Sequence, residues 1–139
     1  MSAYKYQYSL LPGLEKTGIY APMLPVTFIN NKFEFSTFAL VDSGAVRGLI
    51  STVIADELEL KWQNIPKSVG FTTSGQFIYH KIPKLTVRVE DYEFVISINV
   101  AEGINPFKCI LGRNDIFQKA KITFEGYKKE FQIEFRNLN

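Results

Sequence analysis

Two short stretches decide the fold of this chain: Ala39-Leu40-Val41-Asp42-Ser43-Gly44-Ala45, and Cys109-Ile110-Leu111-Gly112-Arg113-Asn114. In the first, an apolar run ends at a carboxylate on a tight Ser-Gly turn. In the second, an apolar run ends at a glycine, with Arg and Asn directly after it. Asp opens many turns because its side chain accepts backbone N–H groups two residues on. Taken alone, Asp42-Ser43-Gly44 therefore favours a structural turn.

The surroundings of this turn favour a functional interpretation. Phe38–Val41 is apolar, so we expect the strand to be buried right up to Asp42. Ala45 and the small residues beside it allow another backbone to come close. The second apolar run, Ile110–Gly112, lies at a spacing that allows it to thread back through the first loop. Together the two elements make Asp42 a candidate catalytic residue.

The composition indicates one globular domain. With 139 residues the chain can bury a sizeable core but is too short for two domains, so 1–139 is taken as one. Apolar residues make up 46% and charged residues 22%, which argues against disorder. The net charge of +2 is too balanced to indicate nucleic-acid binding, so no nucleic-acid partner is expected.

The single cysteine and the absence of long apolar runs bear on location. Cys109 has no partner for a disulfide within the chain, which fits a reducing compartment. No apolar run approaches the ~20 residues of a membrane span. The first residues, Met1–Tyr6, lack the apolar block of a signal peptide. The sequence thus predicts a cytoplasmic protein with no membrane partner.

Turn signals and alternating apolar residues predict many short strands, which the 12 Phe and 7 Tyr also favour. The strands are expected within 1–18, 19–28, 32–41, 49–51, 69–89, 94–100, 108–111 and 121–136. Short helices are expected over 53–58, capped by Ser51 or Thr52, and over 114–119. Pro22 and Pro25 place 19–28 at a sheet edge or a bulge. This pattern predicts a mostly β protein, a closed or partly closed β-barrel with one or two short helices.

Other kinds of catalytic or binding site find little support. His80 is the only histidine, which argues against a Ser-His-Asp or Cys-His system and against a zinc site. Cys109 lies in an apolar strand and is more typical of a buried core residue than of a nucleophile. No glycine-rich phosphate loop is present. We therefore expect no metal and no cofactor.

The two motifs resemble the signatures of the retropepsin-like aspartic proteases, over about residues 19–125. Asp42-Ser43-Gly44-Ala45 matches the family's Asp-Thr/Ser-Gly-Ala. The segment from Cys109 to Phe124 looks like the Ile-Ile-Gly-Arg-Asn segment of the retroviral enzymes with the helix and strand that follow it. The helix after Ser51 and the extra C-terminal hairpin over 121–136 look more like the single-domain bacterial and archaeal relatives.

The resemblance implies the acid protease fold and an aspartic endopeptidase that acts as a homodimer, because one chain carries half of the acid pair. Asp42 from each subunit would be catalytic: one ionised carboxylate activates water and the protonated one binds the scissile carbonyl. Ser43 would hydrogen-bond across the interface, and Gly44 would let the substrate's main chain come close. The implied partners are a second copy and a peptide or unfolded-protein substrate.

The resemblance also assigns the substrate-binding and structural residues. Residues expected to contact substrate are Ala45, Arg47, Thr73, Ser74, Gly75 and Ile110, of which Thr73, Ser74 and Gly75 belong to a flap at the hairpin tip. An ordinary hairpin loop is the alternative for that tip, and plain core is the compatible alternative for Ile110. For Arg47, selection of an acidic substrate side chain competes with a solvent-facing position. Residues expected to be structural are Leu111, Gly112 and Arg113.

One departure from the viral pattern leaves the activity open. The viral enzymes have Asp directly after the Ala, and it pairs with the Arg of the Gly-Arg-Asn segment; here that position is Val46. Arg113 must find another partner, with Asp115, Asp56 or Glu57 as candidates. The alternatives are a catalytically silent peptide-binding or scaffold dimer on the same fold, or a structural partner that docks through the strand of alternating tyrosines. The extra hairpin either replaces the viral interface of interleaved termini or caps the barrel.

Overall fold

The computed structural model describes residues 3–73 and 75–136, so Ser74 of the expected flap lies outside the described residues. The strands are β1 (Ala3–Gln7), β2 (Ser9–Leu10), β3 (Tyr20–Ala21), β4 (Met23–Asn30), β5 (Phe33–Val41), β6 (Leu49–Ser51), β7 (Ser68–Thr72), β8 (Gly75–Val89), β9 (Tyr92–Ala101), β10 (Cys109–Leu111), β11 (Ala120–Glu125) and β12 (Glu130–Phe135). The helices are α1 (Thr52–Glu57), α2 (Ile116–Lys119) and the short 3₁₀ turns η1 (Glu15–Thr17), η2 (Trp62–Asn64) and η3 (Gly126–Lys128). The predicted mostly β composition with two short α-helices is confirmed.

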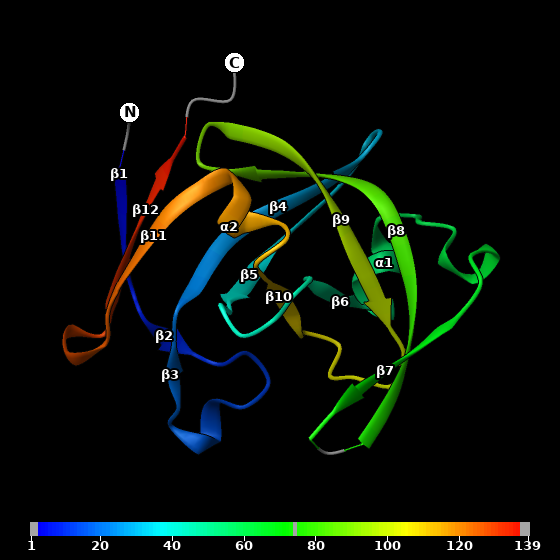
Figure 1. The fold of residues 1–139 in the computed structure, drawn as a ribbon, viewed down its shortest axis with the longest axis horizontal. Helices are drawn as coiled ribbons and strands as arrows, with labels where there is room; N and C mark the ends of the chain where they lie inside the picture. The colour runs from blue at the N-terminus through cyan, green and yellow to red at the C-terminus, as the bar shows by residue number, and fades with distance from the viewer. Residues whose placement is uncertain (1–2, 74, 137–139) are drawn as a thin grey trace.

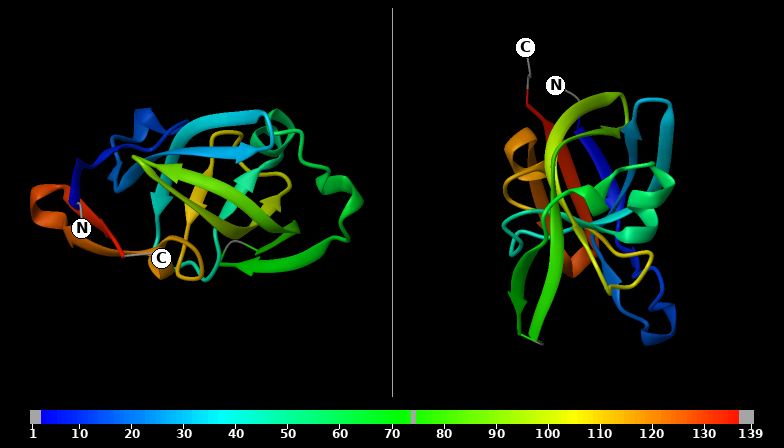
Figure 2. Two further views of the ribbon diagram at one scale, coloured as in Figure 1. Left: turned by 90° about the horizontal axis from the view of Figure 1, so that it is seen from above. Right: turned by 90° about the vertical axis from the view of Figure 1, so that its right-hand side faces the viewer.

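The largest sheet has the strand order β4-β5-β10-β6-β9-β8-β7, and β4 also pairs with β8 (Figure 1). The sheet therefore curves back on itself, as the views along two further directions also show (Figure 2). Whether it forms a closed barrel stays a prediction. The hairpin β7–β8 extends from the body of the sheet at one end (Figure 1).

Prolines fall where the strands can accommodate them. Pro22 separates β3 from β4, and Pro25 lies outside the stretch of β4, Thr27 to Ile29, that pairs with β8. Pro25 thus has only β5 as a neighbouring strand, so its missing N–H lies at a sheet edge, which is one of the two positions predicted from the sequence. In β8, the register against β9 shifts between Ile82 and Leu85, around Pro83, which cannot donate to the ladder.

A second sheet, in the order β1-β12-β11, contains both ends of the described chain. Its inner face packs on the core: Phe135 stacks on Tyr92 with ring centroids 4.4 Å apart, and Tyr6 stacks on Phe131 at 5.3 Å. The C-terminal hairpin therefore covers the core and gives the tyrosine strand β1 a partner in its own chain. This pairing weakens the proposal that β1 is a docking strand for another protein.

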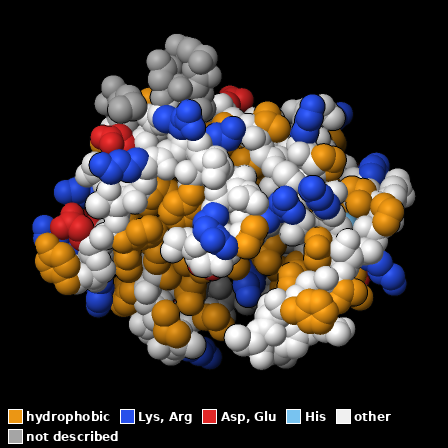
Figure 3. All heavy atoms as spheres, in the orientation of Figure 1, with side chains coloured by type: hydrophobic (Ala, Val, Ile, Leu, Met, Phe, Trp, Pro, Cys, Tyr) orange, Lys and Arg blue, Asp and Glu red, His pale blue; other side chains and the backbone are white. Residues whose placement is uncertain are grey.

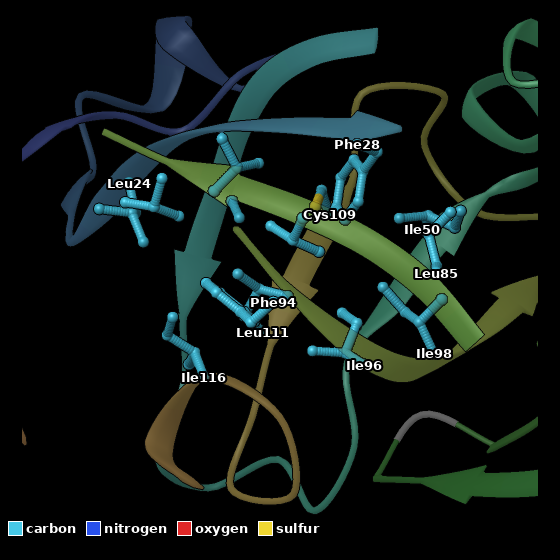
Figure 4. Packing of buried hydrophobic residues seen from close by; sticks show 14 of the residues in the cluster. Leu24, Phe28, Ile50, Leu85, Phe94, Ile96, Ile98, Cys109, Leu111 and Ile116 are labelled. Atoms are coloured by element: carbon cyan, nitrogen blue, oxygen red, sulfur yellow. The ribbon is translucent and has the colours of Figure 1, made fainter. Parts of the chain in front are cut away.

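The core lies inside the curved sheet around β10 (Figure 4). Leu24, Phe28, Ile50, Ile98 and Leu111 have no exposed surface. Cys109 is 3% exposed, and burial raises the pKa of its thiol, as expected of a core cysteine rather than a nucleophile. No helix among the described residues has the length and apolarity needed to cross a membrane.

Candidate active site

Asp42 stands where β5 ends, beside a strand from the far end of the sequence. β10 pairs in parallel with β5 (Leu111 opposite Val41) and antiparallel with β6. The Asp42 backbone N–H donates to the Leu111 carbonyl at 2.9 Å. Because β10 lies between β5 and β6, it passes under the loop that joins them, as the spacing of the two motifs predicts.

The turn that begins at Asp42 is held by its own side chain. The Gly44 N–H donates to Asp42 Oδ1 at 2.8 Å, and the Ala45 N–H donates to the Asp42 carbonyl at 3.2 Å. Asp42 is half-buried, whereas Ser43 and Gly44 are exposed. The carboxylate therefore has a fixed place at the surface of the chain, on a turn whose backbone is open to a ligand or a second subunit.

The segment after β10 clasps this loop through backbone contacts. The Arg113 N–H donates to the Ala45 carbonyl and the Asn114 N–H to the Val46 carbonyl, both at 2.8 Å. A Cβ at Gly112 would lie 2.5 Å from the Ala45 carbonyl oxygen, closer than real contacts allow. Glycine is needed there because two backbones touch, which gives the predicted structural role of Gly112 a physical cause.

Asp115 is the buried carboxylate that joins these two loops, and sequence reasoning did not single it out as a site residue. It is 1% exposed, and its two oxygens accept the N–H groups of Gly48, Gly112 and Ile116 at 2.6–2.7 Å. Burial raises the pKa of Asp115, while the three N–H donors and the charge of Arg47 act in the opposite direction. Its position directly before α2 is an N-cap signal that could have identified it.

The expected partners of Arg113 are wrong. Asp115 binds backbone N–H groups, Asp56 accepts from the Trp62 indole at 2.8 Å, and none of the ion pairs among the described residues includes Arg113, which is exposed. For Arg47, the solvent-facing interpretation holds only in part. Arg47 is half-buried, and its Nε is buried with no hydrogen-bond partner among the described residues.

A cleft of about 670 Å³ lies between the Asp42 loop and the hairpin β7–β8. It brings together four of the expected site residues, Gly44, Ala45, Arg47 and Ile110. From the hairpin, 70–72 of β7 and Gln76, Phe77 and Tyr79 of β8 line it, whereas Thr73 and Gly75 at the tip are exposed and do not. Sequence reasoning missed Phe71, Tyr79, Asn99 and Lys108, which reach the cleft from strands and a loop that are distant in sequence.

A smaller apolar pocket of about 400 Å³ adjoins the cleft and shares Ile104, Lys108 and Ile110 with it. Leu11, Leu14 and Leu40 are among its other walls. Ile110 is 9% exposed, so it is both a core residue and part of the lining, as the two compatible interpretations allow. The arrangement offers a cleft of mixed polar and apolar lining with an apolar pocket beside it, which has room for an extended chain with a large apolar side chain.

The base of the hairpin β7–β8 is fixed by the one histidine. His80, which is 5% exposed, contacts the Ile65 carbonyl through Nδ1 at 2.8 Å and Glu102 Oε2 through Nε2 at 2.7 Å. Since a carbonyl can only accept, Nδ1 carries a proton. Ile65 lies before β7 and Glu102 follows β9. His80, on β8, therefore connects the segment that leads into the hairpin with the end of the neighbouring strand β9.

No three His, Cys, Asp or Glu side chains gather as a possible metal site within 3–73 and 75–136. The chain matches no family model and no curated protein. Solved structures, however, are similar over most of its length. A retropepsin-like aspartic protease from Rickettsia conorii aligns with a TM-score of 0.68 and 16% identity, over 95% of this chain and 98% of that one.

Two more distant structures have the same architecture. The retroviral protease-like domain of Ddi1 from Leishmania major gives a TM-score of 0.57 and 17% identity, over 86% of this chain and 98% of that domain. The EIAV protease, complexed with the inhibitor HBY-793, aligns with a TM-score of 0.53 and 22% identity, over 78% of this chain and 92% of that enzyme. The chain therefore has the fold of the retropepsin-like aspartic proteases.

Proposed function

We propose that this protein is an aspartic endopeptidase that acts as a homodimer, with Asp42 of each subunit as the catalytic residue. The observation that carries the proposal is the Asp42 turn itself. Its carboxylate accepts the Gly44 N–H at the end of β5, and the loop that follows, from Gly44 to Arg47, lines a cleft together with the hairpin β7–β8. One chain supplies one such carboxylate, so a second copy is needed to complete the acid pair.

The chemistry follows from placing two carboxylates together. Two close carboxyl groups cannot both ionise cheaply, so the pair shares one proton. The ionised Asp42 takes a proton from a water molecule, and the protonated Asp42 of the other subunit donates to the scissile carbonyl oxygen. The water oxygen attacks the carbonyl carbon, and the resulting diol breaks its C–N bond as the amine gains a proton. The titration belongs to the pair.

The surrounding residues take supporting roles in this proposal. Ser43, exposed beside Asp42, hydrogen-bonds to the loop of the other subunit, and Gly44 and Ala45 admit the substrate's main chain. Thr73, Ser74 and Gly75 close over bound peptide at the tip of the hairpin. Leu111, Gly112 and Arg113 keep the loop in place through the backbone contacts described above. We further propose that the curved sheet is a closed barrel and that the protein is cytoplasmic, with peptides or unfolded proteins as substrates.

A catalytically silent peptide-binding dimer is the second candidate, and Val46 is the observation that favours it. Val46 is 55% exposed where the viral pattern has a carboxylate that pairs with the Arg of the Gly-Arg-Asn segment. The cleft would still hold an extended peptide in that case. The two candidates differ in cleavage and share the fold, the dimer and the cleft.

The test is cleavage of a diverse peptide library at pH values from about 3 to 8, since a shared-proton pair gives a pH-dependent rate. Asp42→Asn is expected to lower the rate by at least about a thousandfold and to leave the fold unchanged. Asp91→Asn, the same change in an exposed turn between β8 and β9, is the matched control and keeps wild-type activity. Equal cleavage by wild type and Asp42→Asn would overturn the proposal. A folded dimer that binds peptides without cutting them would favour the silent module.

A further inference from the structure

The hairpin β7–β8, which lines the cleft, makes little contact with the core. Each described residue of β7, and of 75–79 in β8, is exposed or half-buried. Val69, Phe71 and Ile78 are 52%, 75% and 37% exposed, and hydrophobic side chains lie on the surface of the hairpin (Figure 3). A segment with so few buried contacts has low local stability. The position of the hairpin therefore depends on the residues at its base.

His80 is the first buried residue of β8 counted from the hairpin tip, and both nitrogens of its ring face acceptors. Nδ1 lies 2.8 Å from the Ile65 carbonyl oxygen, and Nε2 lies 2.7 Å from Glu102 Oε2. A neutral imidazole has one N–H and donates to one acceptor, whereas an imidazolium has two and donates to both. The Glu102 side chain is 41% exposed, so its carboxylate is solvated and the second proton lies on Nε2.

We propose that His80 and Glu102 form a pH-sensitive latch, which holds the hairpin β7–β8 in place while the ring carries both protons and loosens it when one is lost. With one ring proton, either the Ile65 contact or the Glu102 contact must break. The inference concerns access to the cleft and does not depend on the proposed peptidase activity.

Burial gives the lost proton its effect on the hairpin. The His80 side chain is 7% exposed, so in the closed position a nitrogen that loses its partner has little water to replace it. A buried polar atom left without a partner is costly. In an open hairpin, water reaches the ring and satisfies both nitrogens at any pH. Loss of the proton therefore weakens the closed position relative to the open one.

The two contacts of the latch connect three parts of the chain. Ile65 lies three residues before β7 begins at Ser68, and Glu102 directly follows β9. The Glu102 N–H also donates to the Ile78 carbonyl at 2.9 Å, so its backbone stays on the hairpin when its side chain turns away. Residues 70–72 of β7 line the cleft, so a looser hairpin changes how a ligand enters it.

Glu102 is the one charged partner of the ring among the described ion pairs. On β9 the residue opposite His80 is Val100, and from η2 the Trp62 ring packs on the imidazole. Other titratable groups on the surrounding elements are exposed or lie on the opposite face of β8: Asp56 of α1, Lys61 and Lys67 beside η2, and Tyr79 and Lys81 of β8. The pH dependence is therefore assigned to the His80–Glu102 pair.

The chain contains its own reporters of the latch, because His80 is its only histidine and Trp62 its only tryptophan. The NMR shifts of the two ring nitrogens show which of them carry protons. Histidine side chains ordinarily gain and lose a proton between pH 5 and pH 8. We expect both nitrogens to be protonated at pH 5 and one at pH 8. Trp62 fluorescence should change over the same range, since the two ring centroids are 5.0 Å apart.

Amide hydrogen exchange measures the hairpin itself. Each exchange rate is divided by the intrinsic rate at the same pH, because the exchange chemistry also depends on pH. Protection of the β7 amides is expected to fall about tenfold between pH 5 and pH 8. Protection in β4, which lies in the core of the large sheet, should stay constant over this range.

Two variants separate the latch from a general effect of pH. In Glu102→Gln the amide accepts from a protonated Nε2 and donates to a bare one, so β7 should stay protected at both pH values. Glu93→Gln, the same change at an exposed position of β9, is the matched control and keeps the wild-type fall. His80→Phe keeps a ring against Trp62 but removes both contacts, so β7 should exchange fast at both pH values.

Three results would each overturn the latch: equal β7 protection at pH 5 and pH 8 in the wild type, an equal fall in Glu102→Gln, or a ring that keeps both protons at pH 8. If His80→Phe does not fold, the ring shifts and Glu102→Gln still decide. A latch that behaves as expected in a protein that cuts no peptide would support this inference and contradict the peptidase. Peptide cleavage with a hairpin insensitive to pH would do the reverse.

Discussion

Asp115 accepts the backbone N–H of Gly48 at 2.7 Å, across 67 positions of sequence. The same carboxylate accepts the N–H groups of Gly112 and Ile116. A single buried side chain thus fixes the loop after Asp42, the end of β10 and the start of α2 relative to one another. The geometry of the candidate catalytic turn depends on a residue that no substrate needs to touch.

Replacing Asp115 should weaken this junction. Asp115→Asn keeps the size but puts an amide N–H₂ where a backbone N–H must donate, so we expect a loss of about 1–3 kcal/mol in the free energy of unfolding. Chemical denaturation measures it, with Asp91→Asn as the control. A change within ~0.5 kcal/mol of wild type would contradict the role given to Asp115.

The same variant tests the raised pKa of Asp115. Because burial raises that pKa, the folded chain keeps this proton at pH values at which the unfolded chain has lost it. The contribution of protonated Asp115 to stability is complete below the pKa that this residue has in the unfolded chain, and it is lost as the pH rises through the pKa that it has in the folded chain. The stability difference between wild type and Asp115→Asn should therefore shrink as the pH rises from about 3.8 upward. A difference that grows over this range would show that the N–H donors and Arg47 outweigh burial.

Gly112 should not tolerate a side chain. Gly112→Ala would place a Cβ 2.5 Å from the Ala45 carbonyl oxygen. Because that oxygen belongs to the backbone and no flexible side chain can move aside, the loop itself must shift. We expect a loss of about 1–3 kcal/mol in stability together with lower activity, measured by denaturation and peptide cleavage. Gly126→Ala, whose Cβ would meet nothing within 4 Å, is the control. Equal behaviour of the two variants would contradict the close approach.

Arg47 should give the proposed enzyme a preference for acidic side chains. The described lining of the cleft contains two cations, Arg47 and Lys108, and no Asp or Glu. We expect Arg47→Gln to lower kcat/KM about tenfold for a peptide with Glu near the scissile bond, relative to the same peptide with Gln. Arg88→Gln removes an equal charge outside this cleft and serves as the control. Loss of activity toward both peptides alike would assign Arg47 a structural role.

His80 should hold the hairpin in place. His80→Ala removes the contacts to the Ile65 carbonyl and to Glu102, as well as the packing against Trp62 at 5.0 Å between ring centroids. Amide hydrogen exchange in β7 is expected to speed up by tenfold or more, about 1.4 kcal/mol of local stability. Glu102→Gln, which keeps a hydrogen-bonding group, should have a smaller effect. Unchanged exchange in β7 would show that the hairpin is fixed elsewhere.

Local signals predicted most of the secondary structure. The helix cap at Ser51 is confirmed, since the Ile54 N–H donates to Ser51 Oγ at 3.2 Å. The hairpins over 69–89 and 121–136 also form, although 75–89 is one long strand with an irregularity at Pro83. These features depend on residues within a few positions of one another, so the sequence displays them directly.

The candidate site was predicted only where it depends on one stretch of sequence. Gly44 and Ala45, which line the cleft, could be predicted because the turn and the apolar strand before it are continuous. Asp115 and the position of Arg47 were missed, because both depend on how the loop after Asp42 meets the loop before α2. The partner given to Arg113 was wrong for the same reason: charge alone does not show which groups a carboxylate will meet.

The sequence by itself determined the strands, the turns, the Asp-Ser-Gly motif and its glycines, because periodicity, capping and backbone sterics act over a few residues. Only the tertiary structure decided that β10 lies between β5 and β6, that β1 pairs with β12, and that β11 is left with an open edge. Strand pairing is non-local: each edge binds whichever partner the rest of the fold brings to it. The cleft is a consequence of that choice, and no single segment of the chain contains it.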